Sequence, residues 1–430
     1  MHDETIAIHG GYEGESTRAV AVPIYQTVAH DFVDADHAAA VFDLEMPGFH
    51  YNRINNPTND VLERRLAMLE SGSAALVFAS GMAAVSAAIL TLADAGTNVV
   101  SLPQLYGSTY TYFVHVLPSL GVEVRLTADD RAESVSALID GRTRAVFCES
   151  IGNPAGNVVD IEAVAAAAHA RGVPLVVDNT VATPLLLKPA EHGADVVVHS
   201  LTKFVGGHGT ALGGAVVDAG RFRWSEHADR FPGFSRPEPA FHGVVFAEEF
   251  PDRAFAARAR SVTMRNMGAT LAPFNAFLLL QGLETLPARL ERHERNARAV
   301  AEYLAGDDRV AWVSFVGFPD HPSYDLAQRY LGGHAPSIVT FGVEGGYDAG
   351  IALFDSLNLF KRLVNLGDAK SLVAHPASTT HRQLTADDLA VVGIRPEMLR
   401  LSIGLEHAED LCEDLDQALT VATKRSRDAS

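Results

Sequence analysis

Ala194-Asp-Val-Val-Val-His-Ser-Leu-Thr-Lys-Phe-Val-Gly-Gly-His-Gly-Thr210 is the stretch that decides the fold of this chain. It opens with a short apolar run, Val196 to Val198, which predicts a buried strand. Small and hydroxyl residues then surround a single lysine, Lys203, and glycines follow. An α/β enzyme places its chemistry just past the ends of buried strands, which makes Lys203 a candidate functional residue. Taken alone, a surface lysine on a loop is the commoner case.

A second apolar run lies upstream, within Pro174 to Asn179, and Asp178 directly follows its last valine. An acid at the end of a strand is often only a helix cap. Lys203 and Asp178 together can do more: the lysine can form a Schiff base with an aldehyde cofactor, and the acid can keep the ring nitrogen protonated. A pyridoxal phosphate enzyme needs this pair. Ser200 and Thr202 add hydroxyl groups beside the lysine that suit phosphate oxygens.

The segments Val176-Val-Asp-Asn-Thr180 and Ser200-Leu-Thr-Lys203 resemble the pyridoxal phosphate signature of the Cys/Met-metabolism enzymes. The resemblance extends over nearly the whole chain and implies pyridoxal 5'-phosphate as the cofactor. It also implies an α/β protein of the fold-type I transferase class, with a mostly parallel sheet in a large domain and a smaller α+β C-terminal domain. Strands that alternate with helices predict such a sheet independently, covered on both faces.

Length and composition limit the number of domains, the kinds of partner and the location of the protein. The 430 residues fit two domains, and the net charge of −19 argues against a nucleic-acid partner. The two cysteines, Cys148 and Cys412, do not make a disulfide framework, and Cys148 is expected to be a small core residue. No secretory signal or membrane span is recognisable, so we expect a cytoplasmic enzyme without a membrane partner.

We expect three parts along the chain: an arm at 1–58 that contacts the neighbouring subunit, a cofactor-binding large domain at 59–270 and a small domain at 271–430. The arm shows no sustained helical or strand period. Residues 221–265 are expected to form an irregular insertion or lid, and a long helical pattern begins at Met267 and continues to about Leu304.

The arm contains Tyr51-Asn-Arg-Ile-Asn-Asn-Pro-Thr58, which could be no more than a turn before a helix. Chemically, Arg53 could clamp a phosphate and Tyr51 could serve as a second donor. The stretch resembles the family motif whose Tyr and Arg reach the cofactor phosphate of the adjacent subunit. The resemblance therefore implies a homo-oligomer, a dimer or a tetramer built as a dimer of dimers. It also gives Tyr51 a part in substrate binding and proton transfer.

Further cofactor positions follow at strand ends. Ser80-Gly-Met82 forms a strand-to-helix turn, which is either tight packing or an anion site. The resemblance assigns Gly81 and Met82 to the phosphate. Tyr106 could be a rim residue or could stack on a heterocycle, and the family places its counterpart on the pyridine ring. Asn153 precedes a proline and could be a turn residue, but the resemblance directs it to the phenolic oxygen of the cofactor.

Two C-terminal stretches carry the predicted substrate contacts. Arg400, in Leu399-Arg-Leu-Ser-Ile-Gly-Leu-Glu406, offers a rigid fork for a carboxylate but could be an ordinary surface partner. The resemblance places it on the α-carboxylate of an amino-acid substrate, with Ser371 as a second contact. His375 and His381 could suggest a metal, but no further ligands occur at short spacing, so none is expected.

The motif Asn365-Leu-Gly-Asp-Ala-Lys-Ser-Leu372, rather than Ser-Leu-Gly-Gly-x-Glu-Ser-Leu, resembles the O-acetylhomoserine sulfhydrylase branch of the family. That branch implies γ-replacement of O-acetyl-L-homoserine by sulfide or methanethiol, in methionine biosynthesis. Cystathionine γ-synthase and the cystathionine or methionine γ-lyases remain alternatives within the family. A non-catalytic homologue that binds the cofactor is an alternative of another functional class, and an aminotransferase on the same fold is a further one.

Overall fold

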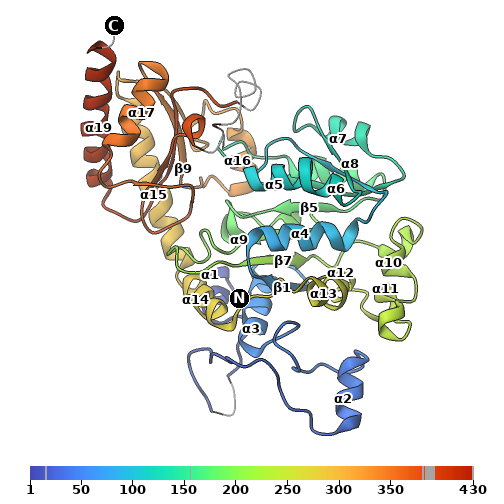
Figure 1. The fold of residues 1–430 in the computed structure, drawn as a ribbon. Helices are drawn as coiled ribbons and strands as arrows, with labels where there is room; N and C mark the ends of the chain where they lie inside the picture. The colour runs from blue at the N-terminus through green and yellow to red at the C-terminus, as the bar shows by residue number, and fades with distance from the viewer. Residues whose placement is uncertain (15–16, 155, 380–381, 383–392, 429–430) are drawn as a thin grey trace. The chain divides into compact units, whose positions relative to one another are not determined.

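The computed structural model describes residues 1–14, 17–154, 156–379, 382 and 393–428 (Figure 1). The chain divides into two compact units. The first contains Met1–Ser150, Asp160–Thr202 and Thr210–Glu284, and the second contains Ile151–Val159, Lys203–Gly209 and Thr285–Ser430. The earlier three-part division, with its arm at 1–58, stays a prediction. No helix in the described ranges is both long and apolar enough to cross a membrane.

A seven-stranded sheet forms the centre of the first unit, in the order β1-β7-β6-β5-β4-β2-β3. Strand β7 runs antiparallel to β1 and β6, and the other neighbouring pairs are parallel, so the predicted mostly parallel α/β sheet is confirmed. The strands are β1 (Ala74–Phe78), β2 (Asn98–Ser101), β3 (Glu123–Leu126), β4 (Thr143–Glu149), β5 (Leu175–Asp178), β6 (Val196–Ser200) and β7 (Gly214–Asp218).

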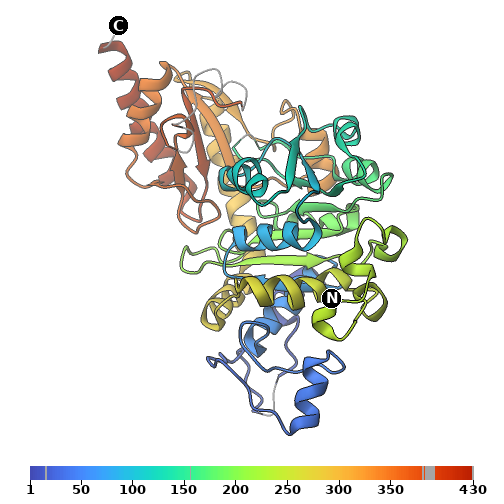
Figure 2. The same ribbon diagram turned by 45° about the vertical axis from the view of Figure 1, so that its right-hand side comes forward.

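Helices flank this sheet. Helix α4 packs against β1, β6 and β7, and α3 packs against β1 and β7 (Figures 1 and 2). The α-helices of the unit are α1 (Asp3–His9), α2 (Ala35–Phe42), α3 (Pro57–Leu69), α4 (Gly81–Leu92), α5 (Gly107–Thr111), α6 (Leu117–Ser119), α7 (Ala132–Leu138), α8 (Ile161–His169), α9 (Thr183–Leu186), α10 (Pro232–Ser235), α11 (Phe246–Glu249), α12 (Ala254–Arg258), α13 (Arg265–Met267) and α14 (Pro273–Glu284).

The predicted strand at Val196 to Val198 lies in β6, which pairs with β5 in the buried part of the sheet. Successive side chains of a strand point to opposite faces, yet all three valines have no exposed surface. Both faces of the sheet are therefore covered at β6. The same is true of Val176 and Val177 on β5, and Cys148 is buried in β4 as expected.

Parallel strands bring their carboxyl ends to one edge of the sheet. Glu149 ends β4 and is in register with Asp178, which ends β5. Ser200 ends β6, which is the next strand along. The carboxyl edge thus gathers polar side chains, as a doubly wound sheet does at its ligand site.

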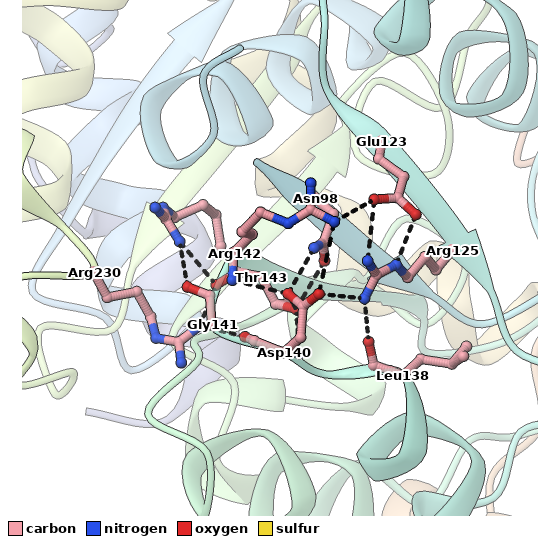
Figure 3. A network of polar contacts seen from close by, with 10 residues as sticks. Asn98, Glu123, Arg125, Leu138, Asp140, Gly141, Arg142, Thr143 and Arg230 are labelled. Atoms are coloured by element: carbon pink, nitrogen blue, oxygen red, sulfur yellow. Dashed lines mark hydrogen bonds and ion pairs between the residues drawn. The ribbon is translucent and has the colours of Figure 1, made fainter. Parts of the chain in front are cut away.

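The amino ends of β2, β3 and β4 carry a separate polar network (Figure 3). Asp140 accepts a hydrogen bond from Asn98 Nδ2 at 2.9 Å and from the main-chain N–H of Arg142 at 2.8 Å. Arg125 lies 2.9 Å from the other carboxylate oxygen of Asp140. Burial opposes ionisation, but these donors together hold the pKa of Asp140 below its usual range. This network ties strand ends together at the edge opposite the candidate site.

The second unit contains a five-stranded sheet in the order β10-β11-β12-β9-β8. Its strands are β8 (Val310–Ser314), β9 (Ile338–Val343), β10 (Lys361–Arg362), β11 (Leu372–Ala374) and β12 (Met398–Ser402). Helices α15 (Leu286–Ala305), α16 (Tyr324–Leu331), α17 (Gly346–Ser356) and α19 (Ala408–Asp428) accompany it. Arg400 on β12 lies opposite Thr340 on β9, so a central strand carries the predicted substrate arginine.

Three local expectations need correction. The arm contains a helix, α2, and Asp34 caps its amino end by accepting from His37 N at 2.7 Å. Residues 221–265 are not an irregular lid: they form short helical turns whose aromatic side chains pack in the core, with Trp224 stacked on Phe234 at 4.0 Å. The long helix predicted from Met267 to about Leu304 is two helices, α14 and α15, and a proline lies in the first turn of α15.

Candidate active site

The amino end of α4 forms one wall of the candidate site in the first unit. Ser80 caps the helix, with its hydroxyl oxygen accepting from Ala83 N at 3.1 Å. A side-chain carbon added at Gly81 would lie 2.6 Å from Cβ and 3.0 Å from Cα of Ser200, so only glycine allows this approach. The first turn of α4 therefore lies directly against the end of β6. Helix N–H groups and the Ser200 hydroxyl together suit a phosphate.

Met82 is the second residue of that turn, and it contacts the short helix α5. Thr109 Oγ1 donates to Met82 Sδ at 3.7 Å. The contact links the predicted phosphate turn to the turn that carries Tyr106, which immediately precedes α5. Two positions predicted from distant parts of the sequence are thus joined through neighbouring side chains.

Asp178 is held by the residue two positions after it. Its Oδ1 accepts from Thr180 N at 3.0 Å and from Thr180 Oγ1 at 2.5 Å. The same Thr180 oxygen accepts from the main-chain N–H of Ser200 at 2.8 Å. The carboxylate of Asp178 is therefore connected to the end of β6 through one threonine. Hydrogen bonds to the ionised form favour a negatively charged Asp178, as pairing with a protonated ring nitrogen requires.

Glu149 anchors the turn of Tyr106. Glu149 Oε1 accepts from the main-chain N–H of Tyr106 at 2.5 Å, while the Tyr106 side chain stays 41% exposed. Burial and the neighbouring Asp178 raise the pKa of Glu149 well above its usual range, against a smaller opposing effect of the Tyr106 N–H. Glu149 is thus favoured in its neutral form beside Asp178. The exposed face of Tyr106 is available for stacking on a flat ring.

The Thr202 hydroxyl is used within the fold. It donates to the main-chain oxygen of Gly213 at 3.2 Å and accepts from Gly213 N at 3.1 Å. Ser200 is therefore the better placed of the two hydroxyls that were expected to meet phosphate.

Tyr51 and Arg53 form a pair of their own in the first unit. The Arg53 guanidinium carbon lies 5.3 Å from the centre of the Tyr51 ring, and Arg53 also donates to the main-chain oxygen of Arg265. In the described part of the chain, no hydrogen bond joins either residue to Gly81, Met82 or Ser200. The 41% exposed ring of Tyr51 is therefore open to an outside contact.

In the second unit, Lys203 and Arg400 both contact Asn365, and Arg400 also contacts Asn153. Lys203 Nζ donates to Asn365 Oδ1 at 2.5 Å. Arg400 donates to the main-chain oxygen of Asn365 at 2.7 Å and to Asn153 Oδ1 at 3.1 Å. Thr340, opposite Arg400 on β9, donates to the main-chain oxygen of Pro154 at 2.8 Å and so fixes the Asn153 turn.

Arg400 is a buried cation without an acidic partner among the described residues. It is only 6% exposed, burial lowers its pKa to about 10, and its Nε has no hydrogen-bond partner in the described chain. A buried, unpaired charge is costly and is normally compensated by an opposite charge. The donor that remains available on Arg400 fits an incoming carboxylate, which would supply that charge.

Ser371, the second predicted carboxylate contact, is occupied by Glu406. Its hydroxyl donates to Glu406 Oε2 at 2.8 Å and accepts from Gly404 N at 2.8 Å, and its main-chain N–H donates to Glu406 Oε1 at 2.7 Å. Ser371 has no exposed surface. Its place as a substrate contact stays a prediction, whereas Asn365 is the loop residue that directly contacts Arg400. His375 is a buried core residue that bonds Ser378 and Pro396, and His381 lies outside the described residues.

Each unit, taken by itself, supplies groups that suit a part of pyridoxal phosphate. The first unit supplies a helix amino end and a hydroxyl for phosphate, an oriented carboxylate for the ring nitrogen and an exposed aromatic face. The second supplies a lysine amine and a buried arginine. Sequence reasoning missed Asn365, Glu149 and Thr180. Asn365 and Thr180 stand within quoted motifs and Glu149 ends β4, but nothing in the sequence alone paired Asn365 with Lys203, Glu149 with Tyr106 or Thr180 with Asp178.

Comparison with known proteins agrees with this geometry. A sequence model of the family described as Cys/Met metabolism PLP-dependent enzyme matches residues 4–420. The chain is 48% identical to O-acetyl-L-homoserine sulfhydrylase 1 of Thermus thermophilus, over 97% of this chain and 100% of the relative. It is 46% identical to homocysteine synthase of Schizosaccharomyces pombe, over 98% of this chain and 99% of the relative.

A solved structure is similar over the same span. It is a Campylobacter jejuni protein described as an O-acetylhomoserine (thiol)-lyase, with a TM-score of 0.94 and 41% identity. The match covers 98% of this chain and 100% of that one, and that protein carries an N'-pyridoxyl-lysine-5'-monophosphate. With a family match along nearly its entire length, this chain belongs to the Cys/Met metabolism PLP-dependent enzymes.

Proposed function

We propose that this enzyme converts O-acetyl-L-homoserine and sulfide into L-homocysteine and acetate, in methionine biosynthesis. Methanethiol in place of sulfide would give L-methionine. The relatives named O-acetyl-L-homoserine sulfhydrylase and homocysteine synthase, at 48% and 46% identity over nearly the full chain, support the reaction. The observation in the structure that carries it is Arg400, a buried cation that lacks an acidic partner within the described residues.

The proposed residue roles follow from the contacts in each unit. The amino end of α4 and the Ser200 hydroxyl bind the cofactor phosphate, Asp178 keeps the ring nitrogen protonated, and Tyr106 stacks on the ring. Thr202, whose hydroxyl is bonded to Gly213, holds the chain in place beside Ser200. Asn153 donates to the phenolic oxygen of the ring. Arg400 binds the substrate α-carboxylate, with Ser371 as the further predicted contact. Bound pyridoxal phosphate supplies an electron sink for the electrons released at the α-carbon.

Lys203 is the proposed base. Its Nζ forms the covalent link to the cofactor before substrate arrives, and it then removes the α-proton and moves protons as the reaction proceeds. The Cγ–O bond breaks to release acetate, and a Cγ–S bond forms with the incoming sulfide. Tyr51, which lies in the arm, assists these proton transfers.

The proposed assembly is a homotetramer, built as a dimer of dimers, in the cytoplasm. Tyr51 and Arg53 support the contact between two subunits, because their side chains make no hydrogen bond to the phosphate turn of their own chain within the described residues. In this arrangement the arm at 1–58 brings both side chains to the cofactor phosphate of the neighbouring subunit.

Product analysis tests the proposed reaction. Purified holoenzyme is mixed with O-acetyl-L-homoserine and sulfide, with cysteine, with methanethiol or with no thiol. Homocysteine and acetate should form in equal amounts with sulfide. Cystathionine formed faster with cysteine would replace the proposal with a γ-synthase. Ammonia and 2-oxobutyrate without any thiol would replace it with a lyase.

A further inference from the structure

Asn365 contacts two proposed functional residues through two different groups. Its side-chain oxygen accepts from Lys203 Nζ at 2.5 Å, and its main-chain oxygen accepts from Arg400 at 2.7 Å. We propose that Asn365 is the positioning residue of the active site, which orients the Lys203 amine relative to the carboxylate-binding guanidinium of Arg400. The inference rests on the proposed function and adds a residue to it.

The loop that carries Asn365 is fixed against the segment that carries Lys203. A side-chain carbon added at Gly367 would lie 2.5 Å from the main-chain nitrogen of Phe204, and the φ angle of +73° there also favours glycine. Ala369 N donates to the main-chain oxygen of Gly207 at 2.8 Å. The two segments are therefore held together backbone to backbone, so the Asn365 side chain starts from a fixed position.

The other sides of both segments are anchored as well. Arg289 of α15 donates to the main-chain oxygens of Phe204 at 2.6 Å and Val205 at 3.1 Å. Gly367 N donates to Ser402 Oγ at 3.0 Å, which ties the loop to β12, the strand of Arg400. The amine, the amide and the guanidinium thus stand on one connected framework within the second unit.

An amide oxygen suits this task. It accepts an N–H without carrying a charge, so it orients the amine without trapping it as an ion pair. A lysine side chain has a flexible four-carbon stem, and fixing it costs rotamer entropy. A single well-placed acceptor removes part of that cost before the proton is transferred. The main-chain bond to Arg400 does not depend on the side chain, so the two tasks of Asn365 can be separated by substitution.

The first test measures how fast the cofactor-free protein captures pyridoxal phosphate, followed by absorbance. Asn365→Ala should capture it about three- to tenfold more slowly, because the amine loses the Asn365 oxygen as an orienting acceptor. Asn365→Asp keeps an oxygen in the same place but stabilises the unreactive ammonium, so its rate should lie below that of the wild type at pH 7 and approach it as the pH rises to 9. Asn358→Ala, an exposed asparagine of the same unit, is the matched control and should behave as wild type.

The second test measures turnover with substrate that carries deuterium at the α-carbon. In Asn365→Ala, kcat should fall about 10- to 100-fold and the isotope effect should rise, while KM changes less than threefold because Arg400 keeps its main-chain bond. Wild-type capture rates and an unchanged isotope effect would overturn the proposal. So would a KM effect with unchanged kcat. If the wild type forms no homocysteine, the proposed reaction fails, and the capture rates still decide the role of Asn365.

Discussion

At the scale of single residues, Arg400 and Glu149 show how the site handles buried charge. Arg400 is bonded only to neutral oxygens, from Asn153 and Asn365, among the described residues. Glu149 is buried beside Asp178 and is favoured as the neutral acid. Arg400 thus keeps a buried charge that has no acidic partner within the described residues, whereas Glu149 is favoured without a charge.

Replacing Arg400 should separate activity from stability. Arg400→Lys cannot reproduce the planar fork, so KM for O-acetyl-L-homoserine should rise by about 10- to 100-fold, and Arg400→Met should raise it further. Because Arg400→Met also removes a buried cation, its melting temperature should be no lower than that of the wild type. Steady-state kinetics and thermal unfolding check both. Arg309→Lys, an arginine of the same unit paired with Asp307, is the control. An unchanged KM in Arg400→Met would remove this residue from the substrate site.

Glu149 gives a prediction for pH dependence. Its pKa is raised in the folded state, so the folded protein binds more protons than the unfolded chain over the interval between the two pKa values. Stability should therefore fall as the pH rises above the usual glutamate pKa of about 4.3. Glu149→Gln keeps an acceptor for the Tyr106 N–H but cannot ionise, so it does not lose stability as the pH rises. It should therefore unfold at a higher temperature than wild type at pH 8. The difference should vanish near pH 4. A variant less stable than wild type at pH 8 would contradict the neutral form of Glu149.

At the scale of elements, apolar runs predicted the parallel strands well because burial on both faces leaves a continuous apolar signal, as at Val196 to Val198. Asp178 and Ser200, which end β5 and β6, could be predicted as site residues because they follow these apolar runs directly. The short helices were not: α2 depends on a cap by Asp34, and residues 221–265 depend on aromatic packing such as Trp224 on Phe234. The role of Asn365 depends on a loop-to-loop contact that no local pattern encodes.

The turn between β1 and α4 should tolerate no side chain. Gly81→Ala would force the helix end away from Ser200 and should weaken pyridoxal phosphate binding by at least about tenfold, since the phosphate donors would move together. Equilibrium dialysis of the cofactor measures this directly. Gly141→Ala is the matched control, because a carbon added there meets no atom within 4 Å. Equal cofactor affinity in Gly81→Ala and wild type would contradict the assignment of this turn to phosphate.

At the scale of the whole molecule, the central proposal is that subunits complete one another's sites. The arm carries Tyr51 and Arg53 as a stacked pair with an exposed ring. Several other large apolar side chains of the arm are exposed as well, including Val20, Val28 and Val33. Apolar surface of this kind commonly marks a protein interface.

Complementation between two inactive variants tests this exchange. Arg53→Ala and Lys203→Ala, each close to inactive alone, are unfolded together and refolded as a mixture. If the arm acts on the neighbouring subunit, a mixed pair has one site with both residues intact. Random pairing should then restore about a quarter of the wild-type activity. If the arm serves its own subunit, every site in the mixture lacks one of the two residues, and activity should stay at the level of the separate variants.

The most direct test of the account is the formation of homocysteine from O-acetyl-L-homoserine and sulfide by the wild type and by Lys203→Ala, both loaded with pyridoxal phosphate. We expect the wild type to release homocysteine and acetate in equal amounts. The variant should be slower by at least about 10³-fold, because both the covalent anchor and the base are lost. No homocysteine from the wild type, or comparable turnover by Lys203→Ala, would contradict the account.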